Sequence, residues 1–288
     1  MALHPDDFVN VTRHATRMLS KRLFQDWNGA LIDVEADPPQ ETGAWAGVMS
    51  MAGRSIGPLG LSMPPRPSED FYEWQALLSA HDFAKGRFVM YEFGAGYGRW
   101  GVNGILLSRE RNRGTKPAHV VFVEASSQRV AALHEHLALN GISIADHQIH
   151  TAALTASSGP VALFGSGYGS LVADRGGVEV PGYPIAHWLS LTDGPVDTIH
   201  MDVQTAEFAC LTPDNLALLK GRVRMMHIST HGHIKGFGDV DEQALSDRIR
   251  AAGWTIVSGA PADRLIQTPY GVFHTCDGWL TAVNEEMI

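Results

Sequence analysis

The chain has 288 residues, of which 44% are hydrophobic and 18% charged, enough apolar material for one large domain or two smaller ones. The 31 Asp and Glu residues outnumber the 22 Lys and Arg residues, and the resulting charge of −9 would repel phosphate backbones, so we expect no nucleic-acid partner. Two cysteines are too few for a disulfide scaffold or a zinc finger, and no secretory signal or membrane-spanning apolar run is evident. These features predict a cytoplasmic protein.

Residues 1–70 differ in texture from the rest of the chain. Apolar side chains at helical spacing predict an amphipathic helix over residues 8–27. Residues 36–70 are dense in proline and glycine but also contain Trp45 and Met49, so we expect an irregular segment that packs over the main domain. Its composition suits a lid over a site or a homodimer contact.

Residues 71–288 are predicted to form a single α/β domain. After a helix that begins beyond Ser68, strands are expected at 88–93, 119–124, 148–154, 160–164, 197–203, 223–230, 254–259, 271–275 and 278–284, with helices at 97–111, 127–140, 206–220 and 240–252. Apolar strands that alternate with amphipathic helices indicate a mostly parallel sheet covered on both faces. The last two strands are joined by a short Cys276–Asp277 turn, so one strand of this pair must be antiparallel.

A glycine-rich turn joins the first strand of this domain to its first helix (YEFGAGYGRW, residues 91–100). Glycines leave no Cβ in the way of a ligand, and ligands bind beyond the carboxyl ends of strands in such sheets. The second strand ends at Glu124, whose carboxylate could accept hydrogen bonds from ribose hydroxyls. We therefore expect a nucleoside cofactor against Gly94, Ala95, Gly96 and Gly98, with Glu124 and Ala125 beside it.

The same turn can be interpreted in two ways. Gly96-x-Gly98-x-x-Gly101 matches a dinucleotide fingerprint, whereas Glu92-x-Gly94-x-Gly96-x-Gly98 matches the loop of a nucleoside-binding methyltransferase. Because the strand ends near Phe93, the first turn glycine should be Gly94. An acidic Glu92 would repel a pyrophosphate but can receive the ammonium group of an amino acid. The pattern thus favours S-adenosylmethionine over NAD.

The second half of the chain adds a more specific resemblance. The segment Asp197–Glu207 (DTIHMDVQTAE) resembles the motif after strand 4 in FkbM-family S-adenosylmethionine-dependent methyltransferases. A bacterial branch of that family, which looks associated with surface polysaccharides, also resembles the chain around Glu73-Trp74, in the glycine loop, in HISTH (227–231) and in DGWLTAVN (277–284). Thr205 departs from the usual glycine, and Gly232-His233 replaces Ser-Arg.

The resemblance implies a class I methyltransferase fold, which is Rossmann-like, with a seven-stranded sheet whose last strand is antiparallel. It also implies O-methylation of a sugar or another natural-product hydroxyl. Such transfer requires the nucleophile in line with the methyl group and a group that takes its proton.

Candidate catalytic residues are expected at the ends of strands 4 and 5. Asp202 could bind the amino-acid end of the cofactor, accept the proton, or cap the next helix. Glu207 lies in a first helical turn, so it is either functional or a partner of the helix dipole. His231 is our preferred base, because imidazole titrates near neutral pH, and His233 is a second choice or a substrate contact.

Further polar residues have either a structural or a functional interpretation. Tyr168, in a glycine-rich stretch, either stacks on a sugar or belongs to a plain flexible loop. His200 and His227 lie within strands and are expected to be hydrogen-bonded core histidines. Asp202, Glu207, His231 and His233 could together hold a divalent cation, but their spacing is not a known ligand pattern, so no metal is expected.

The sequence is therefore compatible with three functions. The preferred one is an S-adenosylmethionine-dependent O-methyltransferase that acts on a sugar hydroxyl. The alternatives are an NAD-dependent oxidoreductase that uses the overlapping fingerprint and a catalytically inactive cofactor-binding module, for which Thr205 is the hint.

Overall fold

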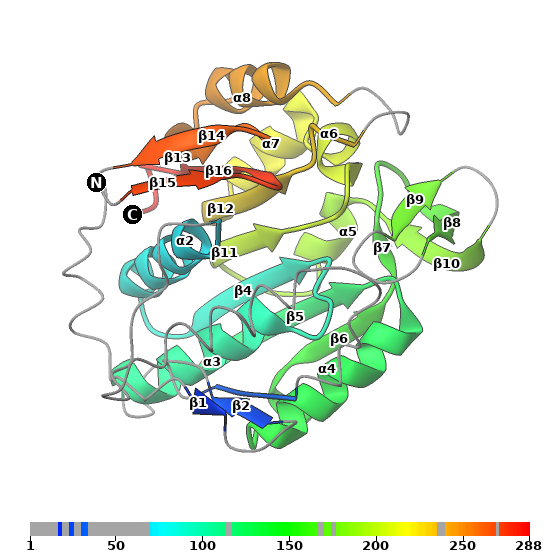
Figure 1. Cartoon of the computed structure of the whole chain (residues 1–288), viewed down its shortest axis with the longest axis vertical. Helices are drawn as coiled ribbons and strands as arrows, with labels where there is room; N and C mark the ends of the chain where they lie inside the picture. Colours follow the sequence, from blue (N-terminus) through cyan, green and yellow to red (C-terminus); the bar gives the residue numbers. More distant parts are fainter. Residues whose placement is uncertain are drawn as a thin grey trace.

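A seven-stranded sheet forms the centre of the molecule, with strand order β13-β16-β12-β11-β4-β5-β6 (Figure 1). The computed structural model describes residues 17–18, 23–25, 30–33, 69–112, 117–165, 170–173, 177–234, 240–268 and 271–288. The last strand, β16, runs antiparallel to both β12 and β13, and the other neighbouring pairs are parallel. The predicted Rossmann-like sheet with its antiparallel last strand is confirmed. The seven strands are β4 (Phe88–Phe93), β5 (Ala118–Glu124), β6 (Gln148–Thr151), β11 (Val196–Met201), β12 (Val223–Thr230), β13 (Thr255–Ala260) and β16 (Gly278–Val283).

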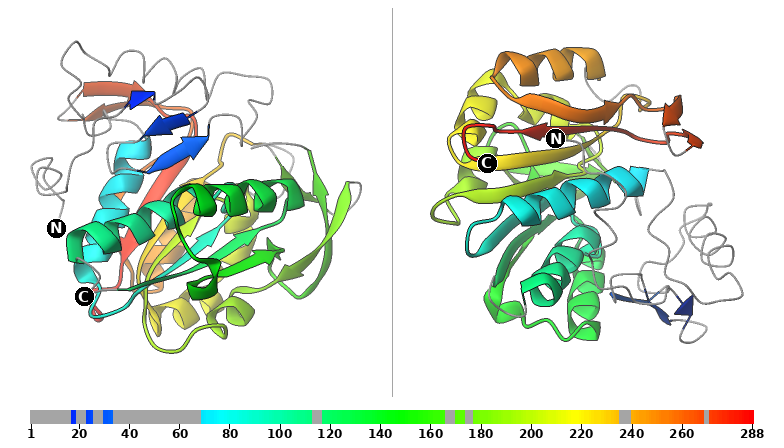
Figure 2. Two further views of the ribbon diagram at one scale, coloured as in Figure 1. Left: turned by 90° about the horizontal axis from the view of Figure 1, so that it is seen from below. Right: turned by 90° about the vertical axis from the view of Figure 1, so that its left-hand side faces the viewer.

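Helices cover both faces of this sheet, as the two further views in Figure 2 show. On one face, α2 (Glu69–Phe83), α3 (Arg99–Asn112) and α4 (Ser127–Leu139) bury a core that includes Trp74, Phe88 and Phe122. On the other, α5 (Ile185–Leu189), α6 (Ala206–Cys210), α7 (Pro213–Lys220) and α8 (Glu242–Ala251) cover a second core. Successive strand residues alternate between the two cores, so residues two apart share a face.

Helix boundaries follow local capping signals. The Ser126 side chain accepts the N–H of Arg129 at the start of α4, and Asp241 accepts the N–H of Ala244 at the start of α8. The single helix predicted for residues 206–220 is wrong, because Thr212 caps a new helix that has Pro213 in its first turn. Among the described helices, none has the length and apolar character required to cross a bilayer.

The strand predictions also need correction. The strand expected at 148–154 is two short strands, β6 and β7 (Ala153–Leu154). β7 belongs to a four-stranded sheet of order β7-β10-β8-β9. In this sheet β8 (Gly159–Phe164) was predicted, whereas β9 (Leu171–Ala173) and β10 (Val178–Tyr183) were not.

The expected hairpin between the last two strands is wrong as well. β15 (Gly271–His274) pairs with β14 (Leu265–Thr268), which was not predicted, whereas β16 pairs with β12 and β13. All six residues of β16 are buried, so the strand belongs between two partners. Val272 of β15 is exposed, which suits a peripheral ribbon.

The predicted helix over residues 8–27 is wrong where the structure describes that segment. β1 (Arg17–Met18), β2 (Leu23–Gln25) and β3 (Leu31–Asp33) form an antiparallel sheet. Asn140, at the end of α4, donates to the carbonyl of Leu31 and accepts its N–H, both at 2.8 Å. This docking onto the main domain overrides the helical periodicity of the segment. Nearly all of the expected cover segment, residues 36–70, lies outside the described residues.

Candidate functional site

The glycine loop turns sharply at the carboxyl end of β4. Gly94, Gly96 and Gly98 all have positive φ values, between +56° and +79°. A Cβ on Gly94 would lie 1.6 Å from the backbone oxygen of Asp202, so no side chain fits there. The loop therefore passes directly against the segment that follows β11. Gly101 of the alternative fingerprint lies inside α3, so the predicted register, with Gly94 as first turn glycine, is confirmed.

Glu124 ties this loop to the end of β5. Its Oε2 accepts the N–H of Gly96 at 2.8 Å, and its Oε1 accepts the N–H of Ser126 at 2.7 Å. The residue is 7% exposed, and burial raises the pKa of its carboxyl group. Ala125 is half-buried beside it. The carboxylate thus fixes the loop and keeps free lone pairs on both oxygens, as a ribose contact would require.

Glu92 has a different environment from the one expected of an ammonium-binding group. Its Oε1 accepts the N–H of Trp100 at 3.0 Å, and its Oε2 accepts the N–H of Gly101 at 2.9 Å. It is 2% exposed, and burial raises its pKa to about 7. Glu92 is therefore bound to the first turn of α3 rather than paired with a cation. Two of the amides with which a helix start could bind an anion are already used.

A strained turn follows β11 and leads into α6. Gln204 and Thr205 have φ values of +49° and +81°, a region that non-glycine residues rarely occupy. Thr205, the departure noted in the sequence, is a β-branched residue for which this conformation is especially unfavourable. Such strain persists only where surrounding contacts hold it. Here the Gln204 amide donates to Asp202 Oδ1 at 3.1 Å and lies 2.9 Å from His231 Nε2.

Beyond this turn, three predicted catalytic residues meet. Nδ1 of His231 lies 2.9 Å from Oε1 of Glu207, and its Nε2 lies 3.2 Å from Oδ1 of Asp202. His231 and Glu207 are fully buried, whereas the Asp202 side chain is 35% exposed. The structure therefore brings β11, α6 and the end of β12 together around one imidazole.

The two carboxylates around His231 favour its cationic form, in which Nε2–H donates to Asp202 and accepts nothing from the Gln204 amide. Although burial opposes it, contacts with Asp202 and Glu207 raise the pKa of His231 well above its ordinary value. Asp202 is only partly buried, and although this desolvation would raise its pKa, the hydrogen bond and charge of His231 lower it. An imidazole that holds its proton at neutral pH orients its carboxylate partners but is a poor proton acceptor.

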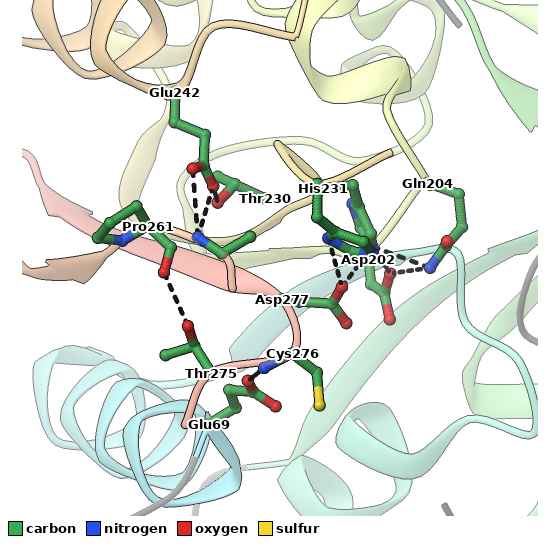
Figure 3. Close-up of polar contacts among 12 residues, drawn as sticks. Glu69, Asp202, Gln204, Thr230, His231, Glu242, Pro261, Thr275, Cys276 and Asp277 are labelled. Atoms are coloured by element: carbon green, nitrogen blue, oxygen red, sulfur yellow. Dashed lines mark hydrogen bonds and ion pairs between the residues drawn. The ribbon is translucent and has the colours of Figure 1, made fainter. Parts of the chain in front are cut away.

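A further carboxylate, which sequence reasoning did not identify as functional, faces the same imidazole (Figure 3). Oδ1 of Asp277 lies 3.9 Å from His231 Nε2 and 3.6 Å from Nδ1 of His233. Its side chain is 38% exposed, and burial raises its pKa. The resemblance over residues 277–284 marked this segment, but only the fold brings the turn before β16 next to Asp202.

Several contacts fix the turn that carries Asp277 (Figure 3). Thr275 Oγ1 donates to the Pro261 carbonyl at 2.9 Å, and Glu69 of α2 accepts the N–H of Cys276. On the other side, Glu242 of α8 accepts from Thr230 and from the N–H of Ala262. These contacts fix the backbone on both sides of Asp277, so its carboxylate leaves the main chain at a defined position next to His231 and His233.

The remaining predicted site residues are placed as follows. His233 is 37% exposed next to Asp277, so it lies at the rim of the site. Tyr168 lies outside the described residues. His200 and His227 are buried in strands and hydrogen-bonded to Glu73 and Thr281, so the prediction of hydrogen-bonded core histidines is confirmed.

Comparison with known proteins gives a consistent result. The family described as "Methyltransferase FkbM domain" matches residues 92–253. A protein of Jannaschia sp. (strain CCS1), described as a methyltransferase, is 27% identical over 222 residues, which cover 70% of this chain and 75% of that protein.

Two solved structures resemble the chain at low sequence identity. The methyltransferase FkbM from Methylobacillus flagellatus KT is 14% identical with a TM-score of 0.44, over 75% of this chain and 56% of that chain. Magnesium protoporphyrin IX methyltransferase from Synechocystis PCC 6803, solved with bound SAM, is 12% identical with a TM-score of 0.41, over 74% of this chain and 80% of that chain.

Proposed function

The chain belongs to the FkbM methyltransferase family, and on that basis we propose that it transfers a methyl group from S-adenosylmethionine to a hydroxyl oxygen of a sugar. The observation that carries the proposal is the glycine loop at the end of β4, with the acidic Glu92 and Glu124 on its two sides. The reaction would take place in the cytoplasm, as the sequence predicts.

The environment of Glu92 supports this cofactor over NAD. A dinucleotide places its pyrophosphate on the free amides of the helix after the loop. Here the N–H groups of Trp100 and Gly101 donate to Glu92, and an anion would meet the Glu92 carboxyl group. S-adenosylmethionine has no phosphate, so it avoids both obstacles. Its ribose suits Glu124, its adenosine passes over Gly94–Gly98, and its ammonium suits the partly exposed carboxylate of Asp202.

For the chemical step we propose separate roles for two carboxylates. Asp202 is anchored by His231 and Gln204 and remains an anion, so it suits orientation of the acceptor hydroxyl or of the cofactor. Asp277 is held less tightly by the two histidines, and its pKa is raised, so it is the better proton acceptor. We therefore move the role of base from His231 to Asp277.

His231 and Glu207 then act as positioning residues. A buried imidazolium between Glu207 and Asp202 fixes the direction in which the Asp202 carboxylate points. Its charge also offsets the repulsion between Asp202 and Asp277. When bound, S-adenosylmethionine would supply the electrophilic methyl group and depart as S-adenosylhomocysteine, while Asp277 would accept the proton of the attacking hydroxyl.

The rim of the site favours neutral or cationic acceptors. Asp202 and Asp277 present partly exposed carboxylates there, which repel anionic groups and accept hydrogen bonds from hydroxyls. A polyol such as a sugar meets this requirement. His233 is exposed at the rim and is proposed to contact the acceptor, and Tyr168 is proposed to stack on its ring.

The test is a screen of neutral, amino and acidic sugars, free and as nucleotide conjugates, with isotope-labelled S-adenosylmethionine. We expect label in a methyl ether of a neutral or amino sugar, located by mass spectrometry of the product. Label on a nitrogen or carbon would contradict O-methylation. Tight binding of S-adenosylhomocysteine without transfer to any acceptor would favour the inactive cofactor-binding module.

A further inference from the structure

A second polar cluster lies below the triad, on the same face of the sheet. Glu92 of β4, His200 of β11, His227 of β12 and Thr281 of β16 are Cα partners in consecutive strand pairs, so they form a row across the sheet. Glu73 of α2 reaches this row, with its Oε1 at 3.1 Å from Nε2 of His200. Asp202 lies two residues beyond His200 and His231 lies four residues beyond His227, a rise of roughly 7 to 13 Å along the strands.

Hydrogen bonding leaves this cluster incomplete. Nε2 of His200 is bonded to Glu73, and Nδ1 of His227 lies 2.9 Å from Thr281 Oγ1. The two other ring nitrogens, Nδ1 of His200 and Nε2 of His227, are buried and have no hydrogen-bond partner in the part of the chain that the structure describes. Buried polar atoms are almost always paired, so the orphan Nε2 of His227, whose ring stacks on that of His200, calls for a physical explanation.

We propose that Glu73, His200 and His227 form a binding site for one divalent transition-metal ion, such as Zn²⁺, between α2 and the central sheet. One ligand atom from each of the three side chains lies within 4.8 Å of the others. Zinc binds imidazole nitrogen at roughly 2.0–2.1 Å, so side-chain shifts of less than about 1 Å would close the site.

The donor chemistry selects the class of ion. Two imidazoles and one carboxylate are a ligand set typical of zinc and other first-row transition metals, whereas Mg²⁺ and Ca²⁺ prefer oxygen ligands alone. These ligands differ entirely from Asp202, Glu207, His231 and His233, the set considered from the sequence. Three protein ligands would leave one position of a tetrahedral ion for water.

The hydrogen bond between His227 and Thr281 also suits a metal ligand. If the Nδ1–H of His227 donates to Thr281, Nε2 presents a lone pair, and the hydroxyl orients the ligand as outer partners do in metal sites. In the metal-free protein, Glu73 and His200 share a proton, and the metal would displace that proton on binding.

The burial of the three side chains indicates a structural role for the metal ion. The side chains of Glu73 and His200 are 12% and 7% exposed, and His227 is 1% exposed. An ion there would join α2 to β11 and β12, the strands that end at Asp202 and His231. The proposed role is to hold α2 and the sheet together beneath the catalytic layer.

The experiment measures metal uptake directly. The full-length protein is stripped with a chelator, dialysed against buffered Zn²⁺ and analysed by mass spectrometry for metal content. We expect one Zn²⁺ per chain, a rise in Tm of about 5 °C or more at saturating Zn²⁺, and visible absorption bands after replacement by Co²⁺. Metal content near zero at micromolar free Zn²⁺ would overturn the proposal and leave a Glu73–His200 hydrogen-bonded pair.

Variants locate the ion. His227→Gln should weaken Zn²⁺ binding at least about 100-fold, and Glu73→Gln, which keeps a hydrogen-bonding group at α2, should do the same if the histidine variant fails to fold. His136→Gln is the matched control, since His136 is a buried histidine of α4 with one bonded ring nitrogen. Equal loss in the control, or unchanged binding in both cluster variants, would contradict the site. Binding of S-adenosylhomocysteine, measured separately, reports on the proposed function.

Discussion

The two halves of the site are built in different ways. On the proposed cofactor side, Glu92 and Glu124 have both carboxylate oxygens bound to main-chain amides around the glycine loop. On the proposed acceptor side, Asp202 and Asp277 are each more than a third exposed and contact histidine side chains. The carboxylates of the cofactor half are thus fixed to the main chain, whereas those of the acceptor half are free to change protonation state. Substitutions should therefore affect binding in one half and chemistry or pH dependence in the other.

The largest effect is expected from Gly94→Ala. The added Cβ would overlap the Asp202 backbone oxygen, and φ of +74° is unfavourable for alanine. We expect a loss of about 3 kcal/mol or more in stability and at least about 100-fold weaker S-adenosylhomocysteine binding, measured by urea unfolding and calorimetry. Gly141→Ala is the control, because Gly141 has φ of +60° but open space around it. Equal effects at both positions would show that the loop makes no close approach.

The next largest effect separates the two carboxylates. Asp277→Asn should lower kcat by about 100-fold or more and change S-adenosylhomocysteine affinity by less than about twofold. In the wild type, kcat should fall as the pH is lowered through the raised pKa of Asp277, because only the ionised carboxylate accepts a proton. Asp214→Asn, an exposed site on α7, is the control. A larger loss of kcat in Asp202→Asn than in Asp277→Asn would exchange the two roles.

A third prediction concerns His231 and stability. Its pKa in the folded protein is raised, so its contribution is complete below about pH 6.5 and is lost as the pH rises through the folded-state value. Wild type should exceed His231→Gln by about 3 kcal/mol in unfolding free energy near pH 6, and this difference should shrink toward pH 10. Urea titrations at several pH values measure it.

His136→Gln serves as the control for that series. Burial lowers the pKa of His136 to about 4, so the folded protein keeps this imidazole neutral while the unfolded chain still binds a proton below about pH 6.5. The difference between wild type and His136→Gln should therefore rise slightly above pH 6 and then level off, opposite to the trend expected for His231→Gln. A difference for His231→Gln that does not fall toward pH 10 would mean that His231 is neutral, and that His231 could then act as a base.

The proposed cofactor half of the site could be predicted from the sequence better than the proposed acceptor half. The glycine loop, Glu92 and Glu124 could be located from the sequence, because the strand ends and the turn glycines are local signals. Asp202, Glu207 and His231 could be named as candidates, but their mutual contacts and the cationic state of His231 depend on three separate segments. Asp277 was missed because the last two strands were expected to pair with each other, and that error hid which strands β16 joins.

The same reasoning explains the errors in the fold. Residues 8–27 have helical periodicity, yet the described part forms strands, because β3 docks on Asn140. Such long-range hydrogen bonds carry no local sequence signal. In contrast, β4, β11, β12 and β16 of the central sheet are buried along their whole length, so their apolar runs could be recognised in the sequence.

The smallest expected effect concerns the strained turn between the two halves. Thr205→Gly should stabilise the protein by about 1 kcal/mol, since φ of +81° costs threonine energy that glycine does not pay. Asp263→Gly, at φ of +53° in an exposed turn, should gain less, because aspartate tolerates this region. Thermal unfolding compares the two variants. A loss of stability in Thr205→Gly would show that the threonine side chain makes contacts that outweigh the strain.

The most direct test of the central claim is calorimetric titration of the protein with S-adenosylhomocysteine and, separately, with NAD⁺. We expect S-adenosylhomocysteine to bind at micromolar concentration and NAD⁺ not to bind. Glu124→Gln should bind S-adenosylhomocysteine at least about tenfold more weakly, because the Gly96 amide and the ribose lose a carboxylate acceptor. Binding of NAD⁺ in preference to S-adenosylhomocysteine, or no binding of S-adenosylhomocysteine at millimolar concentration, would contradict the assignment.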